Sequence, residues 1–184
     1  SGLAIRGDLK IKFDAIHTMP RRFQQIVVNK RGLELWLMYL SLFVSVLGGR
    51  QLHNFLRAYA FRRMEAIRIL SFKKEFVRLK KQLSRKSLSS LKLHALLDSL
   101  SYEVIMLTYA LSGKKIVRQR IKEFFVEYHH KKLTITGHDL LSLGLKPGPR
   151  FSAIFRKVFR AKINGTVHNR REELALVKKI IQNT

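Results

Sequence analysis

Apolar residues recur every three or four positions along most of this chain, and that spacing constrains the fold more than any other feature. Between residues 51 and 83 it places one apolar stripe along a long helix. The same spacing predicts shorter helices at Leu91–Leu97, Tyr102–Leu111, 115–128 and Phe151–Lys162. Only Leu9–Phe13 shows the alternation of apolar and polar residues that is typical of a half-buried strand. We therefore predict an all-α protein.

The first part of the chain is expected to hold further helices. One is predicted at Ala15–Val28. The most apolar run, Leu35–Leu47, has 13 residues, well short of the ~20 that a bilayer crossing needs. It therefore predicts a helix that is buried on most sides. Trp36 and Phe55 are expected in the core, and Ser71 is expected to interrupt the long helix that follows.

Helix boundaries are clearest in the last fifty residues of the chain, where capping residues mark them. Thr136 with Asp139, and Asn169 with Glu172, have the spacing of capping boxes and predict two helix starts. Gly144 is expected to end the first of these helices. The neighbouring Glu172 and Glu173 are expected to interact with the dipole of the last helix.

These elements suggest a multi-helix body followed by a small helical tail with a Gly/Pro turn. We divide the chain into an N-terminal helical part of the body (1–86), a basic helical body (87–132) and a C-terminal helical tail (133–184). The serine-rich stretch Ser84–Ser90 separates the first two parts.

Charge restricts the class of partner. The 184 residues include 37 Lys or Arg and 12 Asp or Glu, a net charge of +25. The 46% of apolar residues are enough for a core and exclude a disordered chain. The basic residues gather in three blocks, at Arg57–Lys86, Lys114–Lys132 and Lys146–Lys179. Such a one-sided excess favours binding to a phosphate backbone.

The sequence contains no recognisable active site. Without cysteine, thiol catalysis and cysteine zinc sites are excluded, and a reducing compartment such as the cytoplasm is favoured. No Asp-x-Asp pair is present. The adjacent His129 and His130 would point about 100° apart on a helix and bind one metal poorly. We expect them at a solvated or phosphate-facing helix end. No catalytic residue, metal ligand or cofactor is predicted within this chain.

Aromatic residues lie mostly at inward spacings, which favours structured RNA, read by shape and phosphate, over single strands. The turn Gly144–Gly148 has two readings of similar weight. It presents backbone N–H groups to phosphate, or it merely caps and connects two helices. The candidate RNA-binding residues are Arg62, Arg63, Lys114, Lys115, Arg118, Lys146, Gly148, Arg150, Arg156, Arg160 and Lys162.

Two other functions stay open at this point. A non-enzymatic protein could bind DNA or RNA through a helix-hairpin-helix-like turn at Gly144–Gly148. Basic amphipathic helices could also bind an anionic membrane or a protein partner. We rank the DNA- or RNA-binding alternative above the membrane or protein-partner alternative.

Two motifs resemble a known family. Residues 133–149 read LTITGHDLLSLGLKPGP, and residues 169–173 read NRREE. They are similar to the C-terminal segment of bacterial tRNA nucleotidyltransferases and poly(A) polymerases, with the pattern TGxDLxxLGLxPGPxIGxIL followed by a turn and TREEAL. Asn169 stands where the family usually has Thr, and Phe151 also departs from the pattern. Residues 87–106 are similar to the helical body of longer members, which include A-adding enzymes.

The resemblance implies that the chain is the body and tail of a larger enzyme. In the family these parts hold the acceptor stem and the TΨC elbow of tRNA. Catalysis, with Mg²⁺ and ATP or CTP, is implied for a separate head whose motifs this sequence lacks. The chain alone is therefore expected to be inactive, and the choice between CCA, A and poly(A) addition is expected to be made elsewhere.

Overall fold

The computed structural model describes residues 7–23 and 33–182 and confirms an all-α fold. Its elements are α1 (Gly7–Phe23), α2 (Leu35–Phe43), the 3-10 turn η1 (Val44–Val46), α3 (Gly49–Ala58), α4 (Arg63–Leu83), α5 (Ser90–Leu97), α6 (Tyr102–Leu111), α7 (Lys115–Glu123), the π turn η2 (Phe124–Tyr128), α8 (Gly137–Ser142), α9 (Pro149–Ile163) and α10 (Arg170–Gln182). No strand occurs in the described ranges, and Leu9–Phe13 lies inside α1.

The first helix begins earlier than the sequence predicted. Since α1 starts at Gly7, only Ala15–Phe23 of the predicted helix Ala15–Val28 coincides with it. The remaining residues of that prediction, 24–28, lie outside the described part of the chain. Pro20 therefore lies in the last turn of α1.

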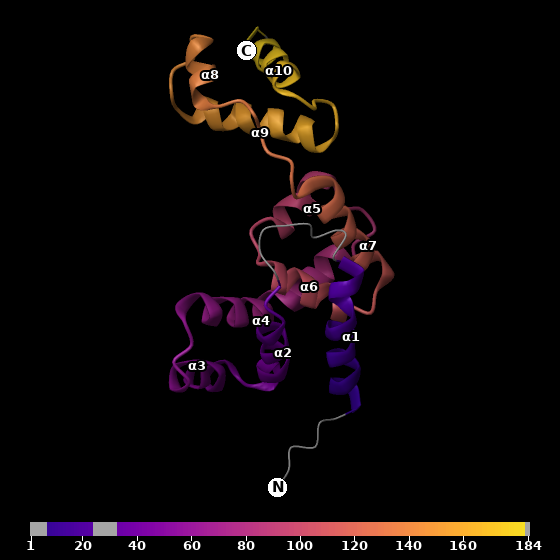
Figure 1. Cartoon of the computed structure of the whole chain (residues 1–184). Coiled ribbons are helices and arrows are strands. Elements are labelled where there is room, and N and C mark those ends of the chain that lie inside the picture. The colour runs from indigo at the N-terminus through magenta and orange to yellow at the C-terminus, as the bar shows by residue number, and fades with distance from the viewer. Residues whose placement is uncertain (1–6, 24–32, 183–184) are drawn as a thin grey trace.

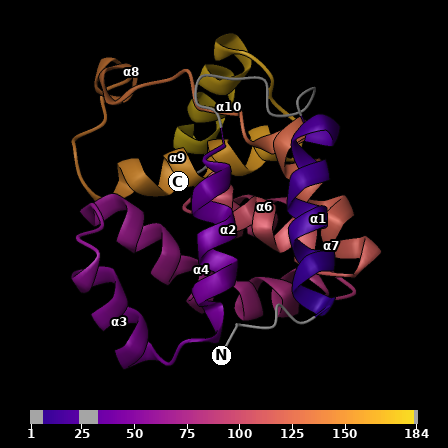
Figure 2. The same cartoon turned by 60° about the horizontal axis from the view of Figure 1, so that its bottom comes forward.

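Helix α6 forms the centre of the body. It packs against α1, α2, α4 and α7, and Figures 1 and 2 both show it surrounded by these helices. Residues 103–108 and Ala110 are all buried, so α6 is enclosed on every side. The run Leu35–Leu47, predicted as a helix buried on most sides, forms α2 and η1. Its buried residues are Leu37, Met38, Ser41, Leu42 and Val44, and its exposed ones are Trp36, Phe43 and Val46. Among the described residues, no helix is long and apolar enough to cross a membrane.

Helix α2 lies between two cores. Met38 and Leu42 join the cluster around α6, whereas Leu37 joins a smaller cluster with α3 and α4. These two contacts leave a third side of α2 open, and Trp36 lies on it with 48% of its surface exposed. The prediction that Trp36 belongs to the core is therefore wrong. Phe55 is half-buried, with its ring 5.9 Å from that of Phe61.

The long helix predicted over residues 51–83 is two helices, and the break is not at Ser71. It follows α3, where Ala60 takes a left-handed conformation with φ of 48°. The N–H of Phe61 donates to the carbonyl of Leu56 at 3.2 Å, which satisfies the end of α3 as in a Schellman motif. Helix α4 then starts with the Glu65 carboxylate accepting a hydrogen bond from the N–H of Arg62 at 3.0 Å.

A π turn follows α7. The N–H of His129 donates to the carbonyl of Phe124, five residues earlier, at 2.8 Å. The widened turn packs His129 against Phe124 and Phe125, and its Nε2 is hydrogen-bonded to the Tyr102 hydroxyl. Burial lowers the pKa of His129. The expected solvated position is therefore correct only for His130, which is exposed.

Helices α8–α10 form the tail and have their own hydrophobic core. Its buried members include Ile135, Leu140, Ile154 and Val177, none of which belongs to the body's cluster. Figure 1 shows the tail at one end of the molecule, joined to the body by the segment after η2. Within the body, residues of α4 and of α5–α7 share one cluster. The division of the chain at residues 86 and 132 stays a prediction.

Replacing Leu79 with Ala should cost about 2–5 kcal/mol of unfolding free energy, because a fully buried leucine leaves a cavity in the main core. Trp36→Ala removes a larger side chain from a half-exposed site and should cost clearly less. Urea unfolding followed by circular dichroism measures both. A greater loss for Trp36→Ala would show that α2 packs differently.

Candidate nucleic-acid interface

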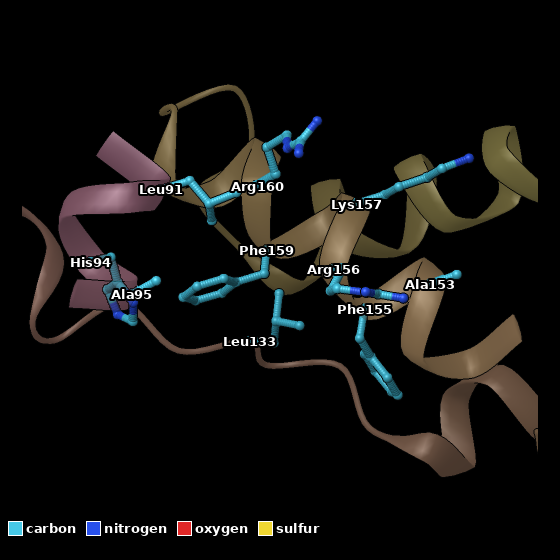
Figure 3. A pocket seen from close by; sticks show the side chains of 10 residues that line it. All are labelled: Leu91, His94, Ala95, Leu133, Ala153, Phe155, Arg156, Lys157, Phe159 and Arg160. Atoms are coloured by element: carbon cyan, nitrogen blue, oxygen red, sulfur yellow. The ribbon is translucent and has the colours of Figure 1, made fainter. Parts of the chain in front are cut away.

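A groove of about 700 Å³ runs between α5 and α9, where the tail meets the body. It is lined by Leu91, His94, Ala95, Leu133, Ala153, Phe155, Arg156, Lys157, Phe159 and Arg160. Figure 3 shows the Phe159 side chain extending from α9 toward His94 of α5, and the two ring centroids are 5.0 Å apart. We call this cavity the α5–α9 groove. Its lining combines apolar residues with three basic side chains of α9, Arg156, Lys157 and Arg160.

The basic side chains of the groove are free to bind an anion. Arg156 and Arg160 are one helical turn apart, and Arg150 and Lys157 are two turns apart. All four are exposed. Arg156 donates only to the carbonyl of Ser152 in its own helix. No carboxylate among the described residues forms an ion pair with any of these side chains, and α9 contains no acid.

Lys162, another predicted RNA-binding residue, has a structural role. It lies on the inner side of α9, is 8% exposed, and its Nζ donates to Oε1 of Glu173 in an ion pair. A lysine with its charge neutralised inside the tail is not available to a phosphate. Lys162 is therefore removed from the candidate interface. Glu173 lies in the first turn of α10, as the dipole expectation requires, and it has this ion pair in addition.

Glu173 is completely buried and connects three segments of the tail. Besides the Lys162 contact, its Oε2 accepts from the N–H of Thr134 at 2.9 Å, the hydroxyl of Thr134 at 2.9 Å and the N–H of Ile135 at 3.0 Å. Burial raises the pKa of this carboxyl, but the hydrogen bonds outweigh it and leave the pKa below its ordinary value. Glu173 is therefore held ionised.

The same segment is held from its other side by Arg170. Its guanidinium donates to the carbonyl of Thr134 at 3.0 Å and forms an ion pair with Asp139. Asp139 also accepts from the N–H of Thr136 at 2.7 Å, which confirms the capping box predicted there. The hydrogen bonds from Thr136 and the charge of Arg170 lower the pKa of Asp139. Helix α10 thus fixes the strand-like segment that leads from the body into α8.

At its first glycine, the Gly/Pro turn between α8 and α9 acts as a helix cap, which is one of its two predicted roles. Gly144 has φ of 80°, and the N–H of Leu145 donates to the carbonyl of Leu140, which ends α8. Lys146 and Gly148 are exposed after it. Pro149 occupies the first position of α9, where its missing N–H is not needed. The predicted cap at Asn169 is also present, its Oδ1 accepting from the N–H of Glu172 at 3.0 Å.

The candidate residues of the body lie apart from the groove. Lys114 and Lys115 are exposed at the start of α7. Arg118 is half-buried and donates to the carbonyls of Tyr109 at 3.2 Å and Ala110 at 3.4 Å, so it caps α6. Arg62 and Arg63 are exposed where α3 ends and α4 begins.

Arg120 lies in the second basic block but supports the body. It is 8% exposed, and its guanidinium donates to the carbonyls of Leu83 and Arg85, both at 2.7 Å, and of Lys86 at 3.3 Å. These groups would otherwise be unsatisfied at the end of α4. The serine-rich stretch after α4 is thereby attached to α7.

The described residues contain no cluster of three or more His, Asp or Glu side chains that could hold a metal ion. Of the ten groove residues, the sequence analysis selected only Arg156 and Arg160, and it missed His94, Lys157 and the six apolar ones. Lys157 could have been found, because it lies seven residues after Arg150 on the same helical face.

Comparison with known proteins is consistent with this architecture. The sequence model of the tRNA nucleotidyltransferase domain 2 family matches residues 33–177, which is most of the chain. The chain belongs to this family. The match includes the body helices from α2 onward and most of the tail, so both walls of the α5–α9 groove are part of this tRNA nucleotidyltransferase domain.

Individual relatives agree with the assignment. The A-adding tRNA nucleotidyltransferase of Geobacter sulfurreducens is 30% identical over 84 residues, 46% of this chain and 10% of that protein. The CCA-adding enzyme of Thermotoga maritima complexed with tRNA shares the fold with a TM-score of 0.69 and 19% identity, over 95% of this chain and 42% of that one. An apo form of a CCA-adding enzyme has the same TM-score at 17% identity, over 97% and 40%. The domain thus spans about two fifths of these solved chains.

Replacing Lys162 with Met should destabilise the tail by about 3–5 kcal/mol, because it leaves the buried Glu173 carboxylate without its cation. Lys157→Met on the exposed face of the same helix should have little effect on stability and should weaken RNA binding. Thermal unfolding and a tRNA-binding titration on both variants measure the two effects. Loss of RNA affinity without loss of stability in Lys162→Met would return that lysine to the interface.

Acid should unfold the tail through Glu173. Its pKa in the folded state is below the ordinary 4.5, so its contribution to stability is complete above pH 4.5 and declines as the pH falls through the folded value. In Glu173→Gln this part of the pH dependence should be absent, whereas the exposed Glu127→Gln should retain it. Unfolding free energies measured at several pH values below 6 test this. Identical pH profiles for the two variants would contradict it.

Proposed function

We propose that this domain binds tRNA and holds its acceptor stem and TΨC elbow for an enzyme that adds nucleotides to the tRNA 3′ end. The observation that carries the proposal is the α5–α9 groove, with three unpaired basic side chains of α9 beside it. Membership of the tRNA nucleotidyltransferase domain 2 family supports tRNA as the ligand. So does the shared fold with an enzyme that was solved together with tRNA.

The charge pattern favours a helical RNA surface over an isolated phosphate. Arg150 and Arg160 are ten residues apart on α9, which corresponds to about 15 Å along the axis. Basic groups distributed over that length follow successive phosphates of a backbone. Exposed Lys146 and Gly148 extend the same surface at the start of α9. We propose Lys146, Gly148, Arg150, Arg156, Lys157 and Arg160 as the tail contacts.

The basic residues of the body are proposed as a second, weaker contact area. Lys114, Lys115, Arg62 and Arg63 are exposed, although they lie on different helices of the body. Arg118 contributes less, because two of its donors are engaged by the end of α6.

Catalysis is assigned to no residue of this domain. Mg²⁺ and ATP or CTP are implied by the family, but the described residues offer no acidic cluster that fits a metal. The 84 matched residues cover 10% of the A-adding relative, and the match to the tRNA-bound enzyme covers 42% of that chain. We propose that it positions tRNA in the cytoplasm while another part of the enzyme carries out nucleotide addition.

Reversing two charges beside the groove, in Arg156→Glu with Arg160→Glu, should reduce affinity for a tRNA transcript at least tenfold. It should also lower the salt dependence of binding by about 0.7–0.9 logarithmic unit for each phosphate that the variant no longer neutralises. Fluorescence anisotropy over a salt series measures both. The matched control is Lys74→Glu with Lys81→Glu, which places the same charge change on exposed sites of α4.

Three outcomes would overturn the proposal. Equal loss in the control pair would mean that only net charge matters. Equal wild-type affinity for a duplex DNA of similar length would favour the DNA-binding alternative with the helix-hairpin-helix-like turn. Binding to anionic liposomes without binding to tRNA would favour the membrane alternative.

A further inference from the structure

A second cavity, of about 490 Å³, lies beside the segment that joins the body to the tail. It is lined by His130, Lys131, Lys132, Leu133, Thr134, Lys162, Val167 and His168, and we call it the joint pocket. It shares only Leu133 with the lining of the α5–α9 groove. Five of its eight lining residues are Lys or His, and the others are Thr134, Leu133 and Val167. In the groove, by contrast, three of ten are Lys or Arg and one is His.

Side chains from both parts of the molecule converge on the joint pocket. His130 and Lys132 belong to the segment that leaves the body after η2, and His168 belongs to the turn between α9 and α10 in the tail. All three are exposed, and within the described residues no hydrogen bond or ion pair occupies their side chains. They are free to bind a ligand.

Lys131 fixes the position of this positive charge. Its Nζ donates to the carbonyl of Ile163 at 3.5 Å, at the end of α9, and lies 5.4 Å from the ring centroid of Tyr128. The ammonium group is thus held between body and tail without a carboxylate partner. An anion in the pocket would find this charge already positioned.

The carboxylates next to the pocket are already engaged. Glu173 is neutralised by Lys162 and by the donors of Thr134 and Ile135. Glu172 accepts from the backbone N–H of His168 at 2.7 Å and from the Asn169 amide at 2.6 Å. The net charge around the pocket is positive, since three lysines (Lys131, Lys132 and Lys162) face two glutamates (Glu172 and Glu173). The imidazoles of His130 and His168 add N–H donors.

We propose that the joint pocket binds an oxyanion of the phosphate class and that this anion bridges body and tail. Resting on the proposed function, we assign the anion to a backbone phosphate of the bound RNA. The bridge connects His130 and Lys132 of the joining segment with His168 of the tail. RNA binding would then restrain the angle between the two parts as well as occupy the groove.

The probe for the pocket itself is inorganic phosphate, compared with chloride at equal ionic strength. Imidazole NMR resonances of His130 and His168 should shift saturably with phosphate, whereas those of the exposed His53 on α3 should not. The melting temperature should rise with phosphate, and the rise should be absent in the triple variant His130→Ala, Lys132→Ala, His168→Ala. Absence of a phosphate-specific shift in the wild-type chain overturns the proposal.

The source of the anion is tested with the same triple variant and a tRNA transcript. Binding to a backbone phosphate predicts roughly a tenfold loss of affinity, with far-ultraviolet circular dichroism unchanged. Lys178→Ala with Lys179→Ala, on exposed sites of α10, is the control. Unchanged tRNA affinity together with a phosphate shift overturns the RNA assignment and makes free phosphate the ligand. If neither the wild type nor the variants bind tRNA, the proposed function fails, whereas the phosphate result still decides the pocket.

Discussion

The carboxylate of Glu173 is the interaction on which the tail depends. It belongs to α10, accepts hydrogen bonds from the segment that enters the tail, and pairs with Lys162 of α9. Without it, two backbone N–H groups and one ammonium group in the tail would lack their partner. Because breaking a buried ion pair costs several kcal/mol, a tail with so small an apolar core depends strongly on this residue. The exposed face of α9 is presented to solvent in a fixed orientation as a result.

The large positive charge of the chain has two physical roles. Arg118, Arg120, Lys162 and Arg170 are engaged by carbonyls and carboxylates, and they cap helices or join segments. The exposed residues of α9 have no such partners and carry the charge that is available to a ligand. Guanidinium groups suit the capping role, since one group satisfies several carbonyls in a plane. Counting charges by sequence block does not separate these two roles.

Much of the fold could be predicted from local patterns. Tyr102–Leu111 coincides with α6, and the caps at Thr136 and Asn169 form as expected, because capping involves residues only three positions apart. The break at Ala60 could not be predicted, since alanine rarely adopts a positive φ and the usual glycine signal is missing. The position of Trp36 depends on two neighbouring cores that compete for different sides of α2, which is a tertiary effect.

The candidate site likewise has features that local sequence patterns predict and features that depend on tertiary packing. The exposure of Arg150, Arg156 and Arg160 follows from helical periodicity, whereas the burial of Lys162 depends on Glu173, eleven residues later, and on the packing of α10. The groove itself requires α5 and α9 to meet, and these helices are separated by about fifty residues of sequence. No pattern within either helix reports that meeting.

The π turn at Phe124–Tyr128 lies where the chain leaves the body for the tail. The hydrogen bond of a π turn joins residues five positions apart, whereas that of an α-helix joins residues four apart, so a π turn contains one extra residue. Each residue of a helix rotates the chain by about 100° and advances it by about 1.5 Å. The extra residue therefore sets the direction in which the chain leaves the body after His129. The direction in which the chain leaves the body therefore depends on this one inserted position.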